Sequence, residues 1–391
     1  MEATDPSPIL KVVRQVAANK TKAAASLASE PSVSQYGPVE GMPELRAALQ
    51  EKLARQNGLE GHEVTITAGA NQAFMDVVLS VLSPGDGVVL FVPYYFNHHM
   101  ALQMTGFAPT LRYGPCDPGT MHPDLDWLAG ALAGAAPRIR LVVIVNPSNP
   151  SGAVLTREEL ECASALCRDA GAWLVLDETY EDFVFVDGVS DAGRAASGAG
   201  ADAAADGTRA PHIIHIFSFS KAYGMAGWRV GYIAHAAGAE LQTALLKAQD
   251  TIPINAAQLS QRLALVAARE AGPAWVRRRA EALAPARAAV GGALRAALGD
   301  DAVFGQGAIY FWARLPAGAP PDEEVMRWLV AAHGVAVVHG SSCGAPGFLR
   351  VSFANAPPEQ VGEAAARLEA ALLDLGSRIR RGAGLDEPAQ A

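Results

Sequence analysis

A lysine in this sequence lies where its amine could react with an aldehyde. Lys221 follows Ser218-Phe219-Ser220, which ends an apolar run typical of a buried strand. An amine partly removed from water at such a position is available to condense with an aldehyde. The serine hydroxyls and Arg229, eight residues after the lysine, suit a dianionic phosphate. A surface lysine without a chemical role fits the same residues, so the interpretation depends on other segments.

Three other segments place polar or small residues at the ends of predicted strands. Asn149, within Asn-Pro-Ser-Asn-Pro-Ser-Gly, fits either a turn or a rigid side chain at the carboxyl edge of a sheet, where α/β folds bind ligands. Asp177 fits either a helix N-cap or a partner for a protonated heterocyclic nitrogen, because an unpaired buried carboxylate is costly. Residues 67–72 fit either a tight turn or a helix start whose backbone N–H groups bind an anion.

Short apolar runs alternate with helical patterns through the first two thirds of the chain. Several runs are near-continuous Val, Ile and Leu, as expected for strands covered on both faces. This alternation predicts an α/β fold with a doubly wound sheet. Helices are predicted at 71–82 and 157–170, the second with a capping box from Thr156 and Glu159. The predicted strands are 63–67, 87–92, 109–113, 139–145, 172–177, 212–218 and 229–234.

The last third of the chain predicts a smaller α+β unit. A long helix at 274–298 precedes strands at 308–314, 334–339 and 348–353 and a helix at 358–375. The polar tail from Gly376 is predicted to lie outside that helix. Residues 188–210 are rich in Ala, Gly and Asp without periodicity, which predicts a surface insertion rather than a domain boundary.

Composition restricts the class of protein. Of 391 residues 50% are hydrophobic, and the formal charge of −9 gives no general attraction to nucleic acid or anionic membrane. The four cysteines form neither a CxxC motif nor a metal-ligand spacing, which fits a reducing compartment. No apolar run approaches the roughly 20 residues that span a bilayer. Residues 9–19 predict a helix, with an organelle transit peptide as the alternative.

The motifs taken together point to a family. In chain order, 69–71, 93–95, Asn149, Asp177, Tyr180, Lys221, Arg229 and Arg350 each lie at or near a predicted strand end. With this set the chain resembles the fold type I, class I aminotransferases that depend on pyridoxal phosphate, over roughly residues 31 to 375. It is similar above all to the plant-type aromatic aminotransferases, which pair methionine with aromatic 2-oxo acids. The likeness is carried by TAGANQAF, VPYYFN, NPSNPSG, FSFSKAYGMAGWRVGYIA, GAIYFWARLP and GFLRVSF.

The resemblance implies a fold and a reaction. The fold is α/β, of the pyridoxal-phosphate-dependent transferase fold type I, with a large domain at 35–285 on a mostly parallel seven-stranded sheet and a smaller α+β domain from 1–34 and 286–391. The reaction is a ping-pong transamination between an amino acid, methionine or aromatic, and an aromatic 2-oxo acid. The implied partners are these small molecules and a second copy in a homodimer, with no nucleic acid and no membrane. The location expected is cytoplasmic, with organelle targeting left open.

The resemblance also implies a role for each matching residue. Lys221 forms a Schiff base with pyridoxal phosphate and moves the substrate proton, Asp177 pairs with the protonated ring nitrogen, and Tyr95 stacks on the ring. Arg350, with Asn149 beside it, holds the substrate carboxylate. No metal is expected. The residues implied to bind the cofactor are Gly69, Ala70, Asn71, Tyr95, Asn149, Asp177, Tyr180, Ser218, Ser220, Lys221, Arg229 and, from the partner subunit, Tyr36.

The neighbouring aromatic and histidine residues are open to two interpretations. Tyr94, Tyr95, Phe96 and Tyr310 could give the site an aromatic lining, which favours aromatic and methionine-like substrates over aspartate. The alternative places most of 310–312 in the core. The pair at 98–99 is predicted to lie on a helix surface rather than to bind a metal, because no carboxylate is near it in sequence.

Several alternatives share the cofactor. A β-lyase acting on cysteine conjugates, a cyclopropane-forming synthase and an aspartate-type aminotransferase would use the same residues around Lys221. A cofactor-binding regulatory module is disfavoured, because no DNA-binding domain fits before Tyr36. Family members carry, ahead of the first helix of the small domain, a segment whose glycine contacts the substrate carboxylate. Since this sequence begins almost at that helix, we expect either a truncated sequence or a different closure over the substrate.

Overall fold

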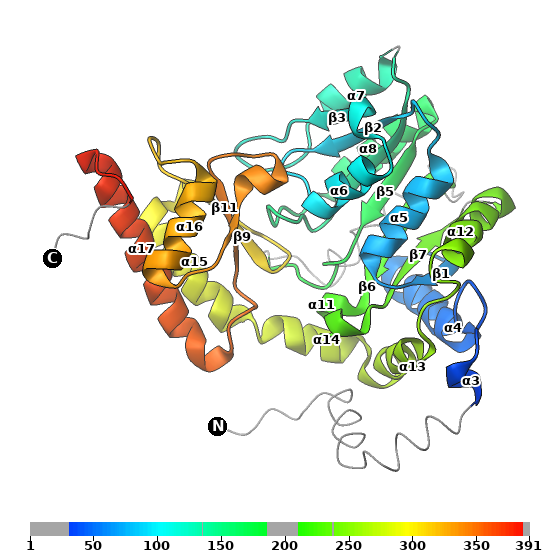
Figure 1. Cartoon of the computed structure of the whole chain (residues 1–391). Helices are drawn as coiled ribbons and strands as arrows, with labels where there is room; N and C mark the ends of the chain where they lie inside the picture. Colours follow the sequence, from blue (N-terminus) through cyan, green and yellow to red (C-terminus); the bar gives the residue numbers. More distant parts are fainter. Residues whose placement is uncertain (1–30, 135, 186–209, 237, 386–391) are drawn as a thin grey trace.

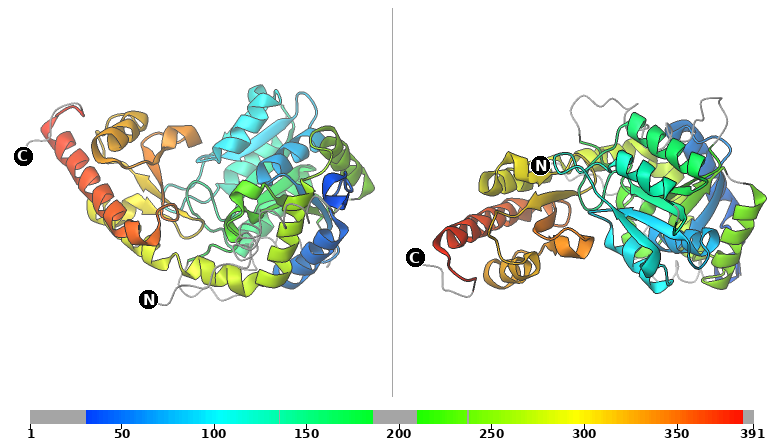
Figure 2. Two further views of the ribbon diagram at one scale, coloured as in Figure 1. Left: turned by 60° about the horizontal axis from the view of Figure 1, so that its bottom comes forward. Right: turned by 90° about the horizontal axis from the view of Figure 1, so that it is seen from above.

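The computed structural model of the protein describes residues 31–134, 136–185, 210–236 and 238–385. The predicted helix at 9–19 and all but the last residue of the predicted insertion at 188–210 lie outside these ranges. Two sheets, one of seven strands and one of four, organise the described chain (Figure 1). Each sheet carries its own helices, and the two units lie side by side in every view (Figure 2).

The larger sheet is mostly parallel. Its order is β1-β7-β6-β5-β4-β2-β3. Strands β2 to β6 run parallel, whereas β7 is antiparallel to both of its neighbours, β1 and β6. Strand β2 is buried along its whole length, as its continuous apolar run predicts. The strands are β1 (Glu63–Thr67), β2 (Gly87–Phe91), β3 (Leu111–Gly114), β4 (Ile139–Val145), β5 (Trp173–Asp177), β6 (Ile213–Ser218) and β7 (Gly231–His235).

The strand predictions hold closely. Those at 63–67 and 139–145 are confirmed residue for residue, and the other five have ends within two residues of the observed ones. Strand β3 starts late because a 3-10 turn occupies Ala108–Thr110. Strand β7 starts after Arg229, whose φ of 52° lies in the left-handed region and so cannot belong to a strand.

Successive strand residues face different helices because side chains alternate across a sheet. Leu90 packs with Phe74 in the layer of α5, α6 and α12, whereas its neighbour Val89 packs with Leu160 in the layer of α7 and α8. Helices α4 and α13 cover the end of the sheet that contains β1 and β7. The helices are α3 (Pro31–Ser34), α4 (Pro43–Lys52), α5 (Ala70–Val81), α6 (Phe96–Met104), α7 (Leu125–Ala133), α8 (Arg157–Ala170), α11 (Phe219–Ala222), α12 (Ala239–Thr251) and α13 (Gln258–Val266).

The second unit is built on a four-stranded antiparallel sheet of order β10-β11-β9-β8. Its core contains Phe311, Leu349 and Leu372. The predicted helix at 274–298 is two helices, interrupted just before Pro285, and strand β8 was not predicted. Helix α14 (Gly272–Glu281) links the two units, because its Trp275 stacks on Tyr223 of the first and its Ala280 belongs to the core of the second. The elements of the second unit are α15 (Ala284–Leu298), β8 (Val303–Phe304), β9 (Tyr310–Arg314), α16 (Asp322–His333), β10 (Val338–His339), β11 (Phe348–Ser352) and α17 (Val361–Arg381).

The last helix is longer than its sequence pattern indicates. Helix α17 continues to Arg381, so the prediction of a non-helical tail from Gly376 is wrong. Arg378, which is 4% exposed, donates to the Asp374 carboxylate at 3.0 Å and lies over the ring of Trp328 at 5.6 Å from its centre. Arg378 thus helps to pack the helix, a role that its polarity did not indicate in the sequence.

Within the described ranges, no helix is both long enough and apolar enough to cross a bilayer. The same ranges hold no cluster of three or more His, Cys, Asp or Glu side chains placed to bind a metal ion.

The start of α8 offers a test of local stability. Thr156 accepts the Glu159 backbone N–H at 3.2 Å, and the Glu159 carboxylate accepts the Thr156 backbone N–H at 2.7 Å. Thr156→Ala should lower the free energy of unfolding by about 1 kcal/mol, measured by urea denaturation. Thr251→Ala, at an exposed position whose hydroxyl bonds within its own helix, is the control and should change it by less than about 0.5 kcal/mol. Equal losses in the two variants would contradict the capping role.

Candidate functional site

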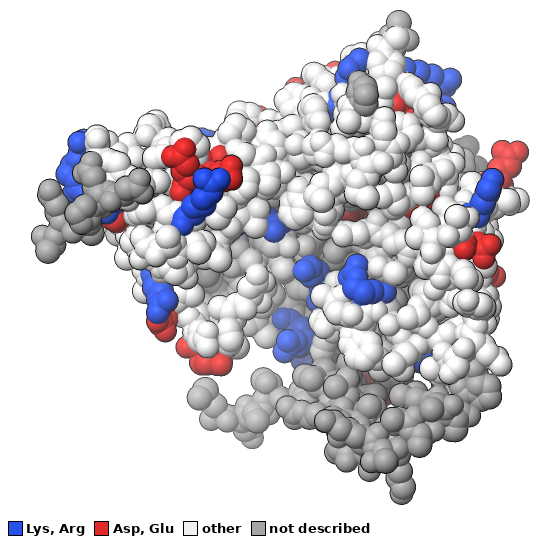
Figure 3. All heavy atoms as spheres, viewed as in Figure 1, with Lys and Arg blue, Asp and Glu red and all other residues white. Residues whose placement is uncertain are grey.

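The carboxyl ends of β4, β5 and β6 face the second sheet across one cavity of about 190 Å³. Basic side chains gather around the hollow between the two units (Figure 3). Most of the residues singled out by sequence line this cavity together. The lining comprises Ala70, Asn71, Tyr95, Phe96, Val145, Asn149, Asp177, Thr179, Tyr180, Ser218, Ser220, Lys221, Ala226, Arg229, Tyr310 and Arg350.

Lys221 is held on the short helix α11, directly after β6. The Ser218 hydroxyl caps this helix by accepting the Ser220 backbone N–H at 3.1 Å, and the buried Phe219 anchors it. In the part of the chain that the structure describes, the Lys221 amine has no hydrogen-bond or ion-pair partner. Its nitrogen is therefore free to react with a molecule in the cavity.

Asp177 ends β5 as a buried, charged carboxylate. Its Oδ2 lies 3.1 Å from Nε2 of His98, and its Oδ1 accepts the Thr179 backbone N–H at 3.1 Å. Both side chains of the pair are about 4% exposed. Burial by itself would raise the pKa of Asp177, but the hydrogen bond and charge of His98 and the bonds from Thr179 lower that pKa below its ordinary value. The site therefore presents a fixed negative charge.

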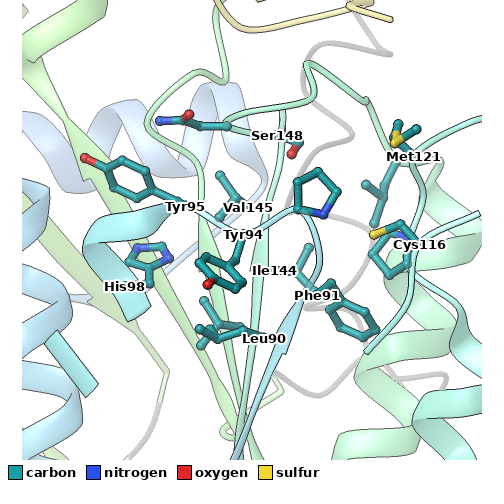
Figure 4. Close-up of a pocket in the computed structure, with 15 residues that line it drawn as sticks. Leu90, Phe91, Tyr94, Tyr95, His98, Cys116, Met121, Ile144, Val145 and Ser148 are labelled. Atoms are coloured by element: carbon teal, nitrogen blue, oxygen red, sulfur yellow. The ribbon is translucent and has the colours of Figure 1, made fainter. Parts of the chain in front are cut away.

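His98 is a functional residue that the sequence analysis placed wrongly. It was predicted to lie on a helix surface, yet it is buried and lies behind Tyr95, against the pocket drawn in Figure 4. The Tyr95 and His98 rings meet edge to face at 5.1 Å. The two residues are three positions apart in sequence, a spacing that places side chains on the same face of a helix. This spacing from Tyr95 was the signal that His98 could face the site, but Asp177, the carboxylate partner of His98, lies 79 residues further along the chain.

Tyr95 stands at the start of α6 with its ring toward the cavity. Its hydroxyl accepts from the Asn97 amide at 2.7 Å and lies 3.4 Å from Oδ1 of Asn71. Behind it a small pocket of about 30 Å³ adjoins the cavity, lined in part by Tyr94, Cys116, Met121 and Ser148 (Figure 4). Tyr94 lines this pocket and stacks on His99, so the predicted aromatic lining of the cavity is reduced to Tyr95, Phe96 and Tyr310.

Arg350 reaches the cavity from the second sheet. Its Nη1 donates to Oδ1 of Asn149 at 2.7 Å, which joins the two units by a hydrogen bond. The guanidinium lies over the Tyr310 ring at 4.4 Å and the Phe96 ring at 5.6 Å. Since one N–H is used on Asn149, the remaining donors can form a fork for a carboxylate.

Tyr180 and Tyr310 form a buried phenol pair. Their hydroxyl oxygens lie 2.8 Å apart. Burial, and then the charge and hydrogen bond of Tyr310, raise the pKa of Tyr180 above its ordinary value. Tyr180 therefore keeps its proton as a hydrogen-bond donor. Phe311 and Trp312, which follow Tyr310, are core residues, as the alternative interpretation proposed.

An anion cradle forms where β1 leads into α5. Gly69 precedes the helix with a φ of +92°, and a Cβ there would lie 2.3 Å from Nη2 of Arg229. The first strand residue of β7, Gly231, is equally confined, because its Cβ would lie 2.7 Å from the Ala70 backbone nitrogen. Arg229 is fixed by bonds to the carbonyls of Ala226 and Ala68, at 3.0 and 3.3 Å. The unpaired N–H groups of the helix start, this guanidinium and the serines suit a phosphate.

Two of the predicted site residues are absent from the cavity lining, Gly69, which directly precedes the lining residue Ala70, and Tyr36. Tyr36 is 79% exposed.

The donor set as a whole has a defined chemistry. A partner-free amine and an anion cradle occupy one cavity with a buried carboxylate. They suit a phosphorylated aldehyde whose ring bears a protonated nitrogen, while Arg350 offers a separate carboxylate site.

Comparisons with known proteins agree with this arrangement. A family model described as aminotransferase class I and II matches residues 8–368. The chain is 44% identical to the aromatic aminotransferase ISS1 of Arabidopsis thaliana, over 88% of this chain and 84% of that protein. It is 30% identical to the aspartate/prephenate aminotransferase of Thermus thermophilus, over 85% and 82%. The solved aromatic aminotransferase from Pyrococcus horikoshii superposes with a TM-score of 0.77 at 27% identity, over 90% of this chain and 91% of that one.

The pair of His98 and Asp177 gives a testable consequence for stability. His98→Leu removes the ring partner of a buried charge and should cost about 3 kcal/mol of the free energy of unfolding at pH 7. Because the pKa of Asp177 is lowered, the contribution is present above the unfolded carboxyl value of about 4 and is lost as the pH falls through the folded value. The difference between wild type and variant should therefore shrink in acid. His99→Leu, which removes a hydrogen bond to the Tyr113 hydroxyl and a stacking contact with Tyr94 but no partner of a charge, is the control and should cost less than about 1.5 kcal/mol.

Similar losses in both variants, or a difference that does not change with pH, would contradict this account of Asp177. Urea unfolding followed by far-UV circular dichroism over about pH 2 to 8, a range that extends below the unfolded carboxyl value of about 4, is the measurement.

Proposed function

The chain belongs to the family of class I and II aminotransferases, and from that membership we propose which residues carry the reaction and which substrates it takes. The protein is a pyridoxal-phosphate-dependent aminotransferase. The observation that supports the residue assignment best is that the partner-free amine of Lys221 shares one cavity with the buried, ionised Asp177.

The residues of the cavity fit pyridoxal phosphate. A Cβ at Gly69 would meet Arg229, so the cradle is shaped by the absence of side chains where the phosphate would lie. In this proposal the backbone of 69–71, together with Ser218, Ser220 and Arg229, holds the phosphate. When bound, the cofactor supplies an aldehyde that links to amines and a ring that accepts electron density from the substrate Cα.

The polar residues of the large unit then divide the tasks of binding the cofactor and moving the proton. Lys221 would hold the cofactor through its amine, and its Nζ would accept and return the proton at the substrate Cα. Asp177, held ionised by His98, keeps the ring nitrogen protonated. Tyr95 would orient the ring, and Asn149 and Tyr180 would donate hydrogen bonds to its phenolic oxygen.

Arg350 holds the substrate. Its planar fork binds the α-carboxylate that every amino acid and 2-oxo acid carries, and the Asn149 side chain fixes its orientation. Binding at this residue is therefore independent of the substrate side chain.

Aromatic amino acids and 2-oxo acids are the substrates best supported. The Arabidopsis relative at 44% identity is named an aromatic aminotransferase. The basic residues of the described cavity lining are Lys221, Arg229 and Arg350, and all three already have a task. No cation of that lining is left for a side-chain carboxylate such as that of aspartate. Rings of Tyr95, Phe96 and Tyr310 suit an aromatic side chain, and methionine is the proposed non-aromatic donor.

The proposed assembly is a homodimer. Tyr36 is exposed on the single chain and would reach the phosphate held by a second copy. Within each copy we divide the chain into a large domain at 35–285 and a small domain that contains 286–391. The hydrogen bond of Asn149 and Arg350 would join them across the cavity.

The reaction is tested by adding amino acids singly to the protein loaded with pyridoxal phosphate and following absorbance and products. Phenylalanine or methionine should convert the cofactor to its amine form with release of the matching 2-oxo acid, and phenylpyruvate should reverse the change. Aspartate should convert it much more slowly. Release of pyruvate and ammonia from a cysteine conjugate, without conversion of the cofactor, would point to a β-lyase instead.

Lys221→Ala should abolish the covalent link and turnover. Borohydride reduction followed by mass spectrometry should attach pyridoxal phosphate to wild type at this residue and leave the variant unlabelled, while turnover falls by at least about 10³-fold. Lys247→Ala, on the distant helix α12, is the control and should be labelled like wild type. Labelling of the Lys221→Ala chain, or full activity, would remove the residue from its role.

Arg350→Ala should weaken the binding of every carboxylate substrate to a similar extent. Loss of a charge-assisted fork is worth about 1.5–3 kcal/mol, so kcat/KM should fall about 10- to 100-fold for phenylalanine and methionine, mainly through KM. Arg314→Ala, on the neighbouring strand with its guanidinium bonded to the Pro118 carbonyl, is the control and should leave KM unchanged. An unchanged KM in the Arg350 variant would exclude it from the carboxylate site.

A further inference from the structure

Tyr310 contacts both Arg350, proposed to bind the substrate carboxylate, and Tyr180, proposed to bind the cofactor. It is the first residue of β9, it is buried, and it lines the cavity. In the antiparallel pair of β9 and β11, Tyr310 lies opposite Ser352 and Trp312 lies opposite Arg350. Tyr310 and Arg350 are thus diagonal neighbours on one face of the sheet, a separation that aromatic and long side chains bridge.

The ring of Tyr310 fixes the direction of the Arg350 guanidinium. The guanidinium carbon lies 4.4 Å from the ring centre, with the Phe96 ring on another side at 5.6 Å. A cation over an aromatic face is worth about 0.5–2 kcal/mol, depending on how far it is removed from water. Together with the bond to Asn149, these ring contacts restrict the orientation of the guanidinium.

The hydroxyl of Tyr310 acts on a different residue. It lies 2.8 Å from the hydroxyl of Tyr180, and either oxygen could be the donor. A phenol has a single proton. In the chain alone Tyr180 is the donor of this bond, because the bond raises the pKa of Tyr180. An anionic oxygen in the cavity is a better acceptor than a phenol, so Tyr180 would turn its proton to that oxygen and accept the proton of Tyr310 instead.

We propose that Tyr310 is a positioning residue that links the carboxylate clamp to the cofactor's phenolic oxygen. Its ring orients Arg350 for the substrate carboxylate. Its hydroxyl donates to Tyr180 and so directs the Tyr180 proton to the phenolic oxygen. The inference rests on the proposed function, because both targets belong to that site.

Two variants of Tyr310 separate the two tasks. Tyr310→Phe keeps the ring and removes the hydroxyl, whereas Tyr310→Leu removes both. Tyr113→Phe, which removes a phenol hydroxyl bonded to His99 away from the cavity, is the matched control. All three are purified as the holoenzyme, and thermal unfolding checks that each is folded.

The first measurement is a pH titration of the visible absorbance of bound pyridoxal phosphate, without substrate. A donor to the phenolic oxygen stabilises its anionic form, so loss of an oriented donor should raise the midpoint. We expect Tyr310→Phe to raise it by about 0.5 to 1 unit, the equivalent of one hydrogen bond, and Tyr113→Phe to leave it unchanged.

The second measurement is the affinity for 3-phenylpropanoate, a carboxylate that has no amino group to transfer, by titration calorimetry. Tyr310→Leu should raise its Kd about 5- to 10-fold, because the guanidinium loses its aromatic contact. Tyr310→Phe should leave the Kd within about twofold of wild type, because the ring remains. The KM for phenylalanine should follow the same order.

An unchanged titration midpoint in folded Tyr310→Phe, or an unchanged Kd in folded Tyr310→Leu, overturns the linkage while leaving transamination by wild type intact. A wild-type chain that binds pyridoxal phosphate but converts no amino acid removes the proposed function, and the linkage with it.

Discussion

The site depends on one constraint, which is that a charged carboxylate ends a strand in the interior of the protein. An unpaired charge at Asp177 would cost several kcal/mol, so the fold must supply donors to it. The His98 ring and the Thr179 backbone do so from two directions. The donor ring comes from α6, whose first turn also carries Tyr95, so the same helix satisfies the charge and places an aromatic ring beside it. The packing of α6 on the sheet therefore also supplies the hydrogen-bond partner of the Asp177 charge.

A second dependence runs between the two sheets. The large unit holds the reactive amine and the anion cradle, whereas the residue that binds a carboxylate comes from β11. Arg350 is bonded to Asn149 and lies between the rings of Phe96 and Tyr310, which belong to opposite sides of the cavity. Neither sheet forms the whole site, and a large buried core in each, with Phe74 in one and Phe311 in the other, keeps them rigid enough to meet there.

Much of the fold followed from the sequence because parallel strands buried on both faces leave long apolar runs, as in 139–145, and because caps such as Thr156 mark helix starts. The cavity could also be predicted from the sequence, since its residues lie at the ends of strands that a doubly wound sheet brings to one edge. Contacts between side chains distant in sequence could not be predicted in this way. His98 was assigned to a surface because its partner comes from another strand, and the pair of Tyr180 and Tyr310 joins two sheets. The polar turn at Arg378 was taken for a tail because tertiary pairing, not periodicity, holds it.

Strand β7 is antiparallel to its neighbours, and this direction has a consequence for how the protein can vary in evolution. Because β7 runs against β6, its first residues, and not its last, lie at the edge where the parallel strands end. Gly231 therefore presses on the start of α5, and the Arg229 side chain fills the space that a Cβ on Gly69 would need. A side chain at Gly69 would displace Arg229, and one at Gly231 would collide with the backbone of Ala70, so neither glycine can be exchanged without disturbing the cradle. Exchanges among Val, Ile and Leu on the surrounding apolar strands change the packing volume little and meet no such limit.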